Sequence, residues 1–132
     1  ITPHTPRFVQ LKAEGIYGRE LLAEPMVFRE QGSGTQSMID HYLDEIGMDR
    51  KKMNVVACLA NSEMLRNVVA AGAGVAIVSE LSAKDMLSAG RVLPFELDER
   101  PVSRGIHMVR RRKGISTKLA EAFAAFVGEQ AL

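Results

Sequence analysis

The alternation of two different apolar periods constrains the fold of this chain more than any other feature. Residues 26–30 (MVFRE) contain apolar and branched residues that predict a short strand. Residues 53–60 (MNVVACLA) and 74–79 (GVAIVS) are nearly continuous apolar segments, typical of strands buried in a sheet. After each of them the sequence changes to the spacing of a helix with one apolar face. Strands that alternate with helices favour an α/β fold whose sheet is built largely from parallel crossovers.

The predicted helices have recognisable ends. An apolar stripe over residues 38–46 predicts a first helix, which Gly47 ends because glycine tolerates the left-handed conformation beyond a helix. Asn61 and Ser62 are suitable capping residues for a second helix. Residues 80–90 predict a short third helix.

The two ends of the chain are less regular. Residues 2–19 show no clean period and predict a loop, with one helical turn at residues 18–23. Residues 91–97 predict an edge strand, because a proline within them cannot donate to a ladder. Residues 104–112 predict a last strand, and Ser116 is the expected cap of a final helix with one apolar face.

Length and composition narrow the class of protein. The 132 residues have room for one domain, and a net charge of +1 gives no general attraction to nucleic acid or membrane. Cys58 is the single cysteine, so no internal disulfide can form, and we expect it to be buried in its apolar run. The chain begins without methionine on a strand-like residue, so we expect it to be part of a longer protein.

The first candidate site is the loop GSGT, which follows the strand at 26–30. The first N–H groups of a helix have no partner within the helix and attract negative charge. Gly34 lets the backbone approach a ligand closely, and Ser33 or Thr35 adds a hydroxyl donor. The alternative is that Ser33 or Thr35 only caps its own helix. The spacing matches neither a P-loop nor a dinucleotide-binding loop.

The second candidate site, LANSEM at residues 59–64, repeats this pattern of buried strand, polar residues and helix. Ligands of open α/β sheets lie at the carboxyl ends of the strands, so the two junctions reinforce each other. The alternative, plain capping by Asn61 or Ser62, remains open.

Other polar residues give weaker signals. The run RRRK at residues 110–113 follows a strand and lacks interleaved aromatic residues, so a solvated strand end is the better interpretation. His4, His41 and His107 show no metal-ligand spacing. No constellation offers the general acid and base that catalysis usually needs, so we expect neither an enzyme nor a cofactor or metal.

Five segments in order resemble the effector-binding (substrate-binding) domain of LysR-type transcriptional regulators. They are EPMVFREQGSGTQ, NSEMLRNVVAAGAGVAIVSE, LSAGRVLPFEL, GIHMVRRRKG and ISTKLAEAFAAFV. The resemblance covers roughly residues 20–130. Two positions depart from the family pattern: Gln36 stands where arginine is frequent, and Ser79 where proline is usual. The first departure bears on the charge of the ligand.

The resemblance implies a fold similar to type II periplasmic binding proteins, with two α/β lobes and an effector cleft between them. Residues 1–108 would then form the second lobe, a parallel or mixed sheet flanked by helices. Residues 109–132 would supply the end of the return strand and the C-terminal helix, which belong to the first lobe. Most of that first lobe and an N-terminal winged helix-turn-helix would be absent from this chain.

The resemblance also implies a function. The chain would be the sensor of a cytoplasmic transcriptional regulator and would bind a small anionic metabolite in the interlobe cleft. On the two junctions described above, the ligand-binding residues would be Ser33, Gly34, Thr35, Asn61 and Ser62. The protein would be a homodimer or homotetramer, and DNA would be bound by a domain outside this chain. The alternative is a periplasmic solute-binding protein that delivers an anion to a transporter.

Overall fold

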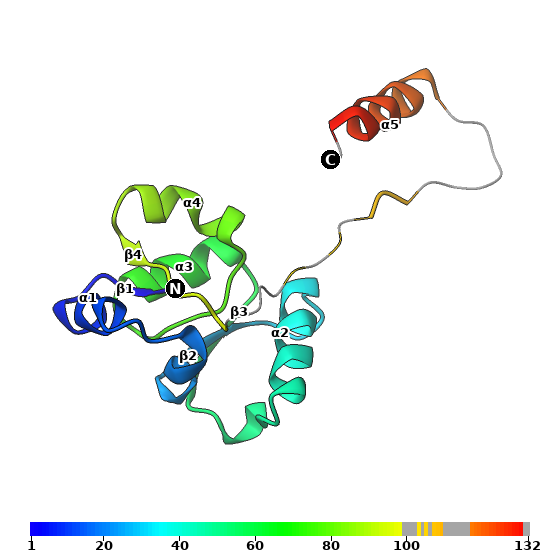
Figure 1. The fold of residues 1–132 in the computed structure, drawn as a ribbon. Coiled ribbons are helices and arrows are strands. Elements are labelled where there is room, and N and C mark those ends of the chain that lie inside the picture. The colour runs from blue at the N-terminus through cyan, green and yellow to red at the C-terminus, as the bar shows by residue number, and fades with distance from the viewer. Residues whose placement is uncertain (99–102, 104, 106, 110–116, 131–132) are drawn as a thin grey trace.

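The structure, a computed structural model, describes residues 1–98, 103, 105, 107–109 and 117–130 (Figure 1). The helices are α1 (Pro6–Ala13), η1 (Gly18–Ala23), α2 (Gly34–Glu45), η2 (Arg50–Lys52), α3 (Ser62–Ala70), α4 (Glu80–Ser88) and α5 (Lys118–Gln130), of which η1 and η2 are 3-10 helices. The strands are β1 (Thr2–Pro3), β2 (Met26–Arg29), β3 (Val55–Leu59) and β4 (Val92–Leu93). The predicted α/β class is confirmed.

The strands form a mixed arrangement with β2 near its centre. β2 pairs in parallel with β3 on one side, and Met26 forms a parallel bridge with Val75 on the other. Next to Val75, the N–H of Ala76 donates to the carbonyl of Ile1 at 3.0 Å. β1, which follows Ile1, pairs antiparallel with β4. The backbone therefore runs side by side in the order β3, β2, residues 75–76, β1 and β4.

Helices cover both faces of this arrangement. Met26 and Phe28 of β2 pack in a core cluster with residues of α1, η1 and α2. Val27, which points to the opposite face, packs with residues of α3 and α4. Phe28 is only 1% exposed, and burial of such a side chain contributes roughly 1.5–3 kcal/mol. The two clusters fix the positions from which α2, α3 and α4 begin.

The segment 74–79, predicted as a strand, lies beside β2 but is only partly a strand. Val75 makes two backbone bonds to its neighbour, from its N–H to Pro25 O at 2.8 Å and from Val27 N–H to its own carbonyl at 2.9 Å. Beyond Ala76 the regular pairing ends. Gly74 is required at this crossing, because a Cβ there would collide with the Pro25 carbonyl oxygen.

The prediction of a loop over residues 2–19 is wrong for its central part, which forms α1. Pro6 stands in the first turn of α1, where its missing N–H has no helical partner to lose. Phe8 is the one buried residue of this helix, so its apolar period is too weak to recognise in the sequence. The helical turn predicted at residues 18–23 is confirmed as η1.

The prediction that residues 53–60 are buried is also wrong. Val55 and Val56 are 37% and 48% exposed, and Cys58 is exposed as well. The reason is that β3 has β2 on one side and no other strand beside it among the described residues. An apolar run here marks an edge strand, and Cys58 is not the buried hydrophobe that we expected.

The C-terminal predictions have mixed outcomes. In the predicted strand at 91–97 only β4 is a strand, and it ends directly before Pro94. The predicted strand at 104–112 lies largely outside the described residues, and so does Ser116. The final helix is confirmed as α5, with the Thr117 hydroxyl accepting the N–H of Ala120 at 3.2 Å.

The apolar side chains of α5 are largely exposed: Leu119 is 80% exposed, and Phe123 and Phe126 are each 60% exposed. Among the described residues, no helix is long and apolar enough to cross a membrane.

Candidate functional site

Three strand-to-helix junctions lie at the same edge of the sheet. β2 and β3 are parallel neighbours, and Val75 is bridged to β2 in the same direction, so their carboxyl ends point the same way. α2 follows β2, α3 follows β3 and α4 follows residues 74–79. The predicted adjacency of the first two junctions is confirmed. We call this surface the carboxyl edge.

The first turn of α2 begins after a tight turn in which the Ser33 N–H donates to Glu30 O at 3.3 Å. Gly32 makes this turn possible, because its φ of 92° is in the left-handed region that favours glycine. Ser33 is the N-cap residue, but its side chain makes no capping bond. Within the described residues, no side chain accepts the N–H groups of Gly34 and Thr35. The alternative of plain capping by Ser33 is therefore wrong.

The first turn of α3 is different. Asn61 is its N-cap residue, and the Asn61 side-chain oxygen accepts the N–H groups of Glu63 at 2.7 Å and Met64 at 3.3 Å. This is ordinary helix capping, the alternative that the sequence left open for Asn61. Ser62, the first residue of α3, is half-buried and adds a hydroxyl to the carboxyl edge.

Arg29, the last residue of β2, extends along the carboxyl edge and was missed by the sequence analysis. Its Nε donates to Leu59 O at 3.2 Å, and its Nη2 donates to Ala60 O at 2.7 Å. The guanidinium thus lies at the end of β3, directly before α3. Its position at a strand end, next to the GSGT loop, was the signal that could have identified it.

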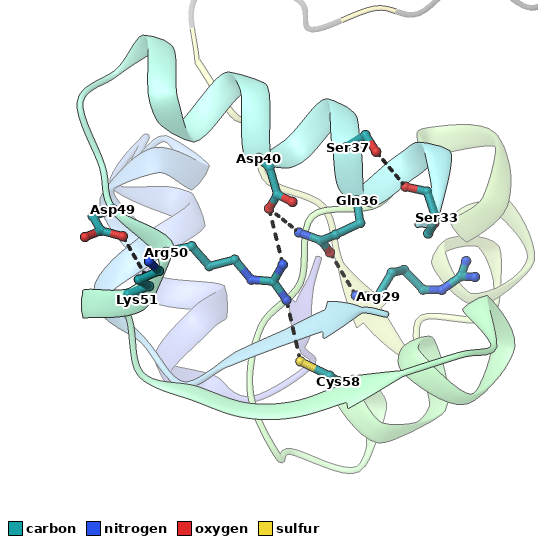
Figure 2. A network of polar contacts seen from close by, with 9 residues as sticks. All are labelled: Arg29, Ser33, Gln36, Ser37, Asp40, Asp49, Arg50, Lys51 and Cys58. Carbon is teal, nitrogen blue, oxygen red and sulfur yellow. Dashed lines mark hydrogen bonds and ion pairs between the residues drawn. The ribbon is translucent and has the colours of Figure 1, made fainter. Parts of the chain in front are cut away.

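A polar network centred on the buried Gln36 holds α2 against the strands (Figure 2). Gln36 is 1% exposed, and its side-chain oxygen accepts the N–H of Arg29 at 3.0 Å. The Gln36 amide nitrogen donates to Asp40 at 2.7 Å, and Asp40 also contacts Arg50 at 3.4 Å. Gln36 was expected to influence the charge of the ligand, but its polar atoms bind the protein itself.

Arg50 connects this network to the strands below α2. Its guanidinium lies 4.6 Å from the centre of the Phe28 ring, and its Nη2 lies 3.5 Å from Cys58 Sγ. Together with the Gln36 bonds, these contacts fix the first half of α2 relative to the ends of β2 and β3.

A cavity of about 550 Å³ lies on the other flank of α2. Its lining is mostly apolar and includes Thr35 and Met38 of α2, residues 75–81 and residues 94–98. Of the five predicted ligand-binding residues, Thr35 is the one that lines this cavity. Ser33 and Gly34 share its helical turn, whereas Asn61 and Ser62 lie at the neighbouring junction.

One polar residue of the cavity lining, Asp98, is held by two neighbouring side chains. Asp98 contacts Arg19 at 3.3 Å and accepts a hydrogen bond from the Tyr42 hydroxyl at 3.4 Å. Burial, followed by the nearby charge of Asp98, raises the pKa of Tyr42. In the part of the chain that the structure describes, no three His, Cys, Asp or Glu side chains are grouped to hold a metal ion.

Comparison with known proteins identifies relatives of this chain. A family model described as the LysR substrate binding domain matches residues 10–132. An uncharacterised HTH-type transcriptional regulator of Methanocaldococcus jannaschii is 30% identical over 108 residues, covering 82% of this chain and 36% of that protein. The HTH-type transcriptional regulator CbbR of Rhizobium meliloti is 27% identical over 110 residues, covering 83% of this chain and 34% of that protein.

A solved structure shows the same fold. The regulatory domain of a HypT variant from Salmonella typhimurium matches with a TM-score of 0.54 at 19% identity, covering 86% of this chain and 55% of that one. The chain spans about a third of the length of the two regulators named above. From the family match over residues 10–132, the chain belongs to the LysR substrate-binding domain family.

Proposed function

We propose that this chain senses a small anionic effector for a LysR-type transcriptional regulator and thereby controls DNA binding by another part of the protein. The observation that carries the proposal is the family match over residues 10–132. The relatives described above are themselves transcriptional regulators. A binding domain, rather than an enzyme, also agrees with the absence of a catalytic constellation from the sequence.

The proposed effector site is the carboxyl edge, with Ser33, Gly34, Thr35, Asn61 and Ser62 as ligand-binding residues. The free N–H groups in the first turn of α2 support this assignment, because they and the helix dipole attract an anion. The side-chain oxygen of Asn61 already accepts two N–H groups of α3. Asn61 would therefore contribute to the site by holding the first turn of α3 in place. Thr35 and Ser62 would contribute their hydroxyls.

The proposed organisation has two lobes. Residues 1–108 form the second lobe, and residues 109–132 return to a first lobe that faces the carboxyl edge. The exposed apolar face of α5 supports this proposal, because Leu119, Phe123 and Phe126 need a surface to pack against. A winged helix-turn-helix would bind DNA in a cytoplasmic homodimer or homotetramer. Effector binding would shift the populations of lobe arrangements, provided that the effector binds one arrangement better.

The proposal is tested by titrating candidate anions against the full-length protein and against its Thr35→Ala, Ser62→Ala double variant. We expect the double variant to bind the effector roughly tenfold or more weakly, because two hydroxyl donors to a charged group are lost. A Thr5→Ala, Ser88→Ala variant is the matched control, since it loses two hydroxyls that lie outside the carboxyl edge. Equal affinity of the double variant and the control would contradict the proposed site.

The alternative, a solute-binding protein of a transporter, makes a different prediction. Such a protein would bind its anion without any change in the affinity of the full-length protein for DNA. A gel-shift titration with promoter DNA, with and without effector, separates the two functions. The regulators among the relatives favour the first.

A further inference from the structure

Arg29 brings a positive charge to the carboxyl edge, in a position set by the backbone. Its Nε and Nη2 donate to two successive carbonyls, those of Leu59 and Ala60. Two bonds of this kind fix the plane of the guanidinium, so little side-chain freedom remains to be lost when a ligand binds.

The guanidinium retains donors that the protein does not use. An arginine has five N–H donors, and the bonds to Leu59 and Ala60 use one on Nε and one on Nη2. The Nη1 group and the other N–H of Nη2 make no hydrogen bond within the described part of the chain. Two adjacent free donors suit the two oxygens of a carboxylate or a phosphate.

The neighbourhood of Arg29 contains further donors for the same anion. Figure 2 shows its side chain extending from the end of β2 beneath the first turn of α2, on the side where Ser33 lies. The N–H groups of Gly34 and Thr35 in that turn are not capped. The bonds of Arg29 to residues 59 and 60 place it directly before α3.

Three acidic residues also lie at the carboxyl edge. Glu30 follows Arg29, Glu63 lies in the first turn of α3 and Glu80 begins α4, and all three are exposed. Without Arg29, an anion would therefore approach carboxylates that repel it. The Arg29 guanidinium offsets the negative charge of these carboxylates.

We propose that Arg29 binds the oxyanion of the effector, a carboxylate or a phosphate, and that it is the residue that makes the site selective for anions. This inference rests on the proposed function, since it assigns the charged contact of the same effector site. It adds a residue from β2 to the hydroxyls and N–H groups of α2 and α3.

The test is a titration of the ¹⁵N-labelled protein with sodium phosphate, and separately with sodium acetate, at constant ionic strength maintained with sodium chloride. In the native protein we expect saturable shifts of the Gly34 and Thr35 amide signals and of the Arg29 Nε–H signal. Arg29→Gln should weaken binding of the anion about tenfold or more, because a charge-assisted hydrogen bond is lost. Arg29→Lys should have intermediate affinity. The response to acetate or to phosphate shows which oxyanion the site prefers.

Arg7→Gln is the matched control, because Arg7 is an exposed arginine that pairs with Glu24 away from the carboxyl edge. It should bind phosphate and acetate as the native protein does. Equal binding by Arg29→Gln and Arg7→Gln would overturn the inference, and so would the absence of any saturable shift in the native protein. If Arg29→Gln fails to fold, an Arg29 Nε–H signal that neither anion moves in the native protein overturns it.

The two proposals fail differently. If Arg29→Gln binds as the native protein does but Thr35→Ala, Ser62→Ala does not, the inference about Arg29 is wrong and the effector site stands. If the double variant is unaffected and Arg29→Gln loses binding, the anion contact stands and the proposed set of hydroxyl ligands is wrong.

Discussion

The first turns of α2 and α3 look alike in sequence but differ in structure. Both follow a strand, and both begin with a small polar residue, Ser33 in α2 and Asn61 in α3. Asn61 accepts two N–H groups of its own helix, whereas the Ser33 side chain caps none. The first N–H groups of α3 are thus hydrogen-bonded to the cap residue of that helix. Those of α2, at the same sheet edge, have no side-chain acceptor among the described residues. A helix end that the protein does not cap is the better place for a ligand.

The network behind α2 explains how an uncapped helix end is kept in place. Gln36 ties α2 to β2 and to Asp40, and Asp40 contacts Arg50. α3 is held by its cap, by the almost fully buried Leu65 and Val69, and by polar contacts of its body, Arg66 with Asp85 at 3.6 Å and Asn67 with Arg91 at 3.3 Å. The body of each helix is therefore anchored, and the two differ in that only α3 also has its first turn capped by a side chain.

The largest predicted effect comes from breaking the anchor of α2. Gln36→Ala removes a buried side chain and leaves the N–H of Arg29 without its acceptor. We expect the free energy of unfolding to fall by roughly 2–4 kcal/mol, from the lost hydrogen bonds and the cavity together. Urea unfolding of the variant measures this, with the exposed Gln31→Ala as the control. A loss no greater than that of the control would show that α2 is held in another way.

A smaller effect is predicted for removing each N-cap side chain. Asn61→Ala should lower the free energy of unfolding by about 1 kcal/mol, because two N–H groups of α3 lose their acceptor. Ser33→Ala should change it by only a few tenths of a kcal/mol, since that side chain makes no capping bond. Thermal melting of the two variants compares them directly. Equal losses would mean that the two helix ends do not differ in solution.

A gain in stability, no larger than the loss expected for Asn61→Ala, is predicted for capping α2. Ser33→Asp supplies a carboxylate that can accept the free N–H groups and complement the helix dipole, which should stabilise the fold by roughly 0.5–1 kcal/mol. The same carboxylate would compete with the effector, so binding of phosphate should weaken while the melting temperature rises. A variant that melts higher and binds phosphate as before would indicate that the effector does not use this turn.

Much of the fold could be predicted from periodicity. The strand at residues 26–30 and the helices that became α2, α3 and α4 were recognised because their apolar faces are buried. α1 was missed because it buries only Phe8. Residues 53–60 were recognised as a strand, which is β3, but were wrongly expected to be buried, because an apolar run does not reveal whether a strand lies at an edge. To be buried, β3 would need a further strand beside it, and the described residues provide none beyond β2.

The candidate site was harder to predict than the fold. The two junctions could be located, because the carboxyl ends of parallel strands must meet at one edge. Which of the two helix ends is capped could not be predicted, because Ser33 and Asn61 are both good capping residues. They differ in backbone geometry, which the sequence does not reveal. Arg29 was missed because its side chain is positioned by carbonyls 30 and 31 residues further along the chain.

Gly74 lies at the end of the strands opposite to the carboxyl edge, and its missing side chain bears on the geometry of that edge. Any side chain at this position would meet the Pro25 carbonyl oxygen, which is backbone and has no rotamer to change. Relief would require the Val75 N–H to move away from that oxygen, and the segment that leads into α4 would shift with it. The position of the first turn of α4 relative to that of α2 therefore depends on the absence of a Cβ at residue 74, at the opposite end of the strands.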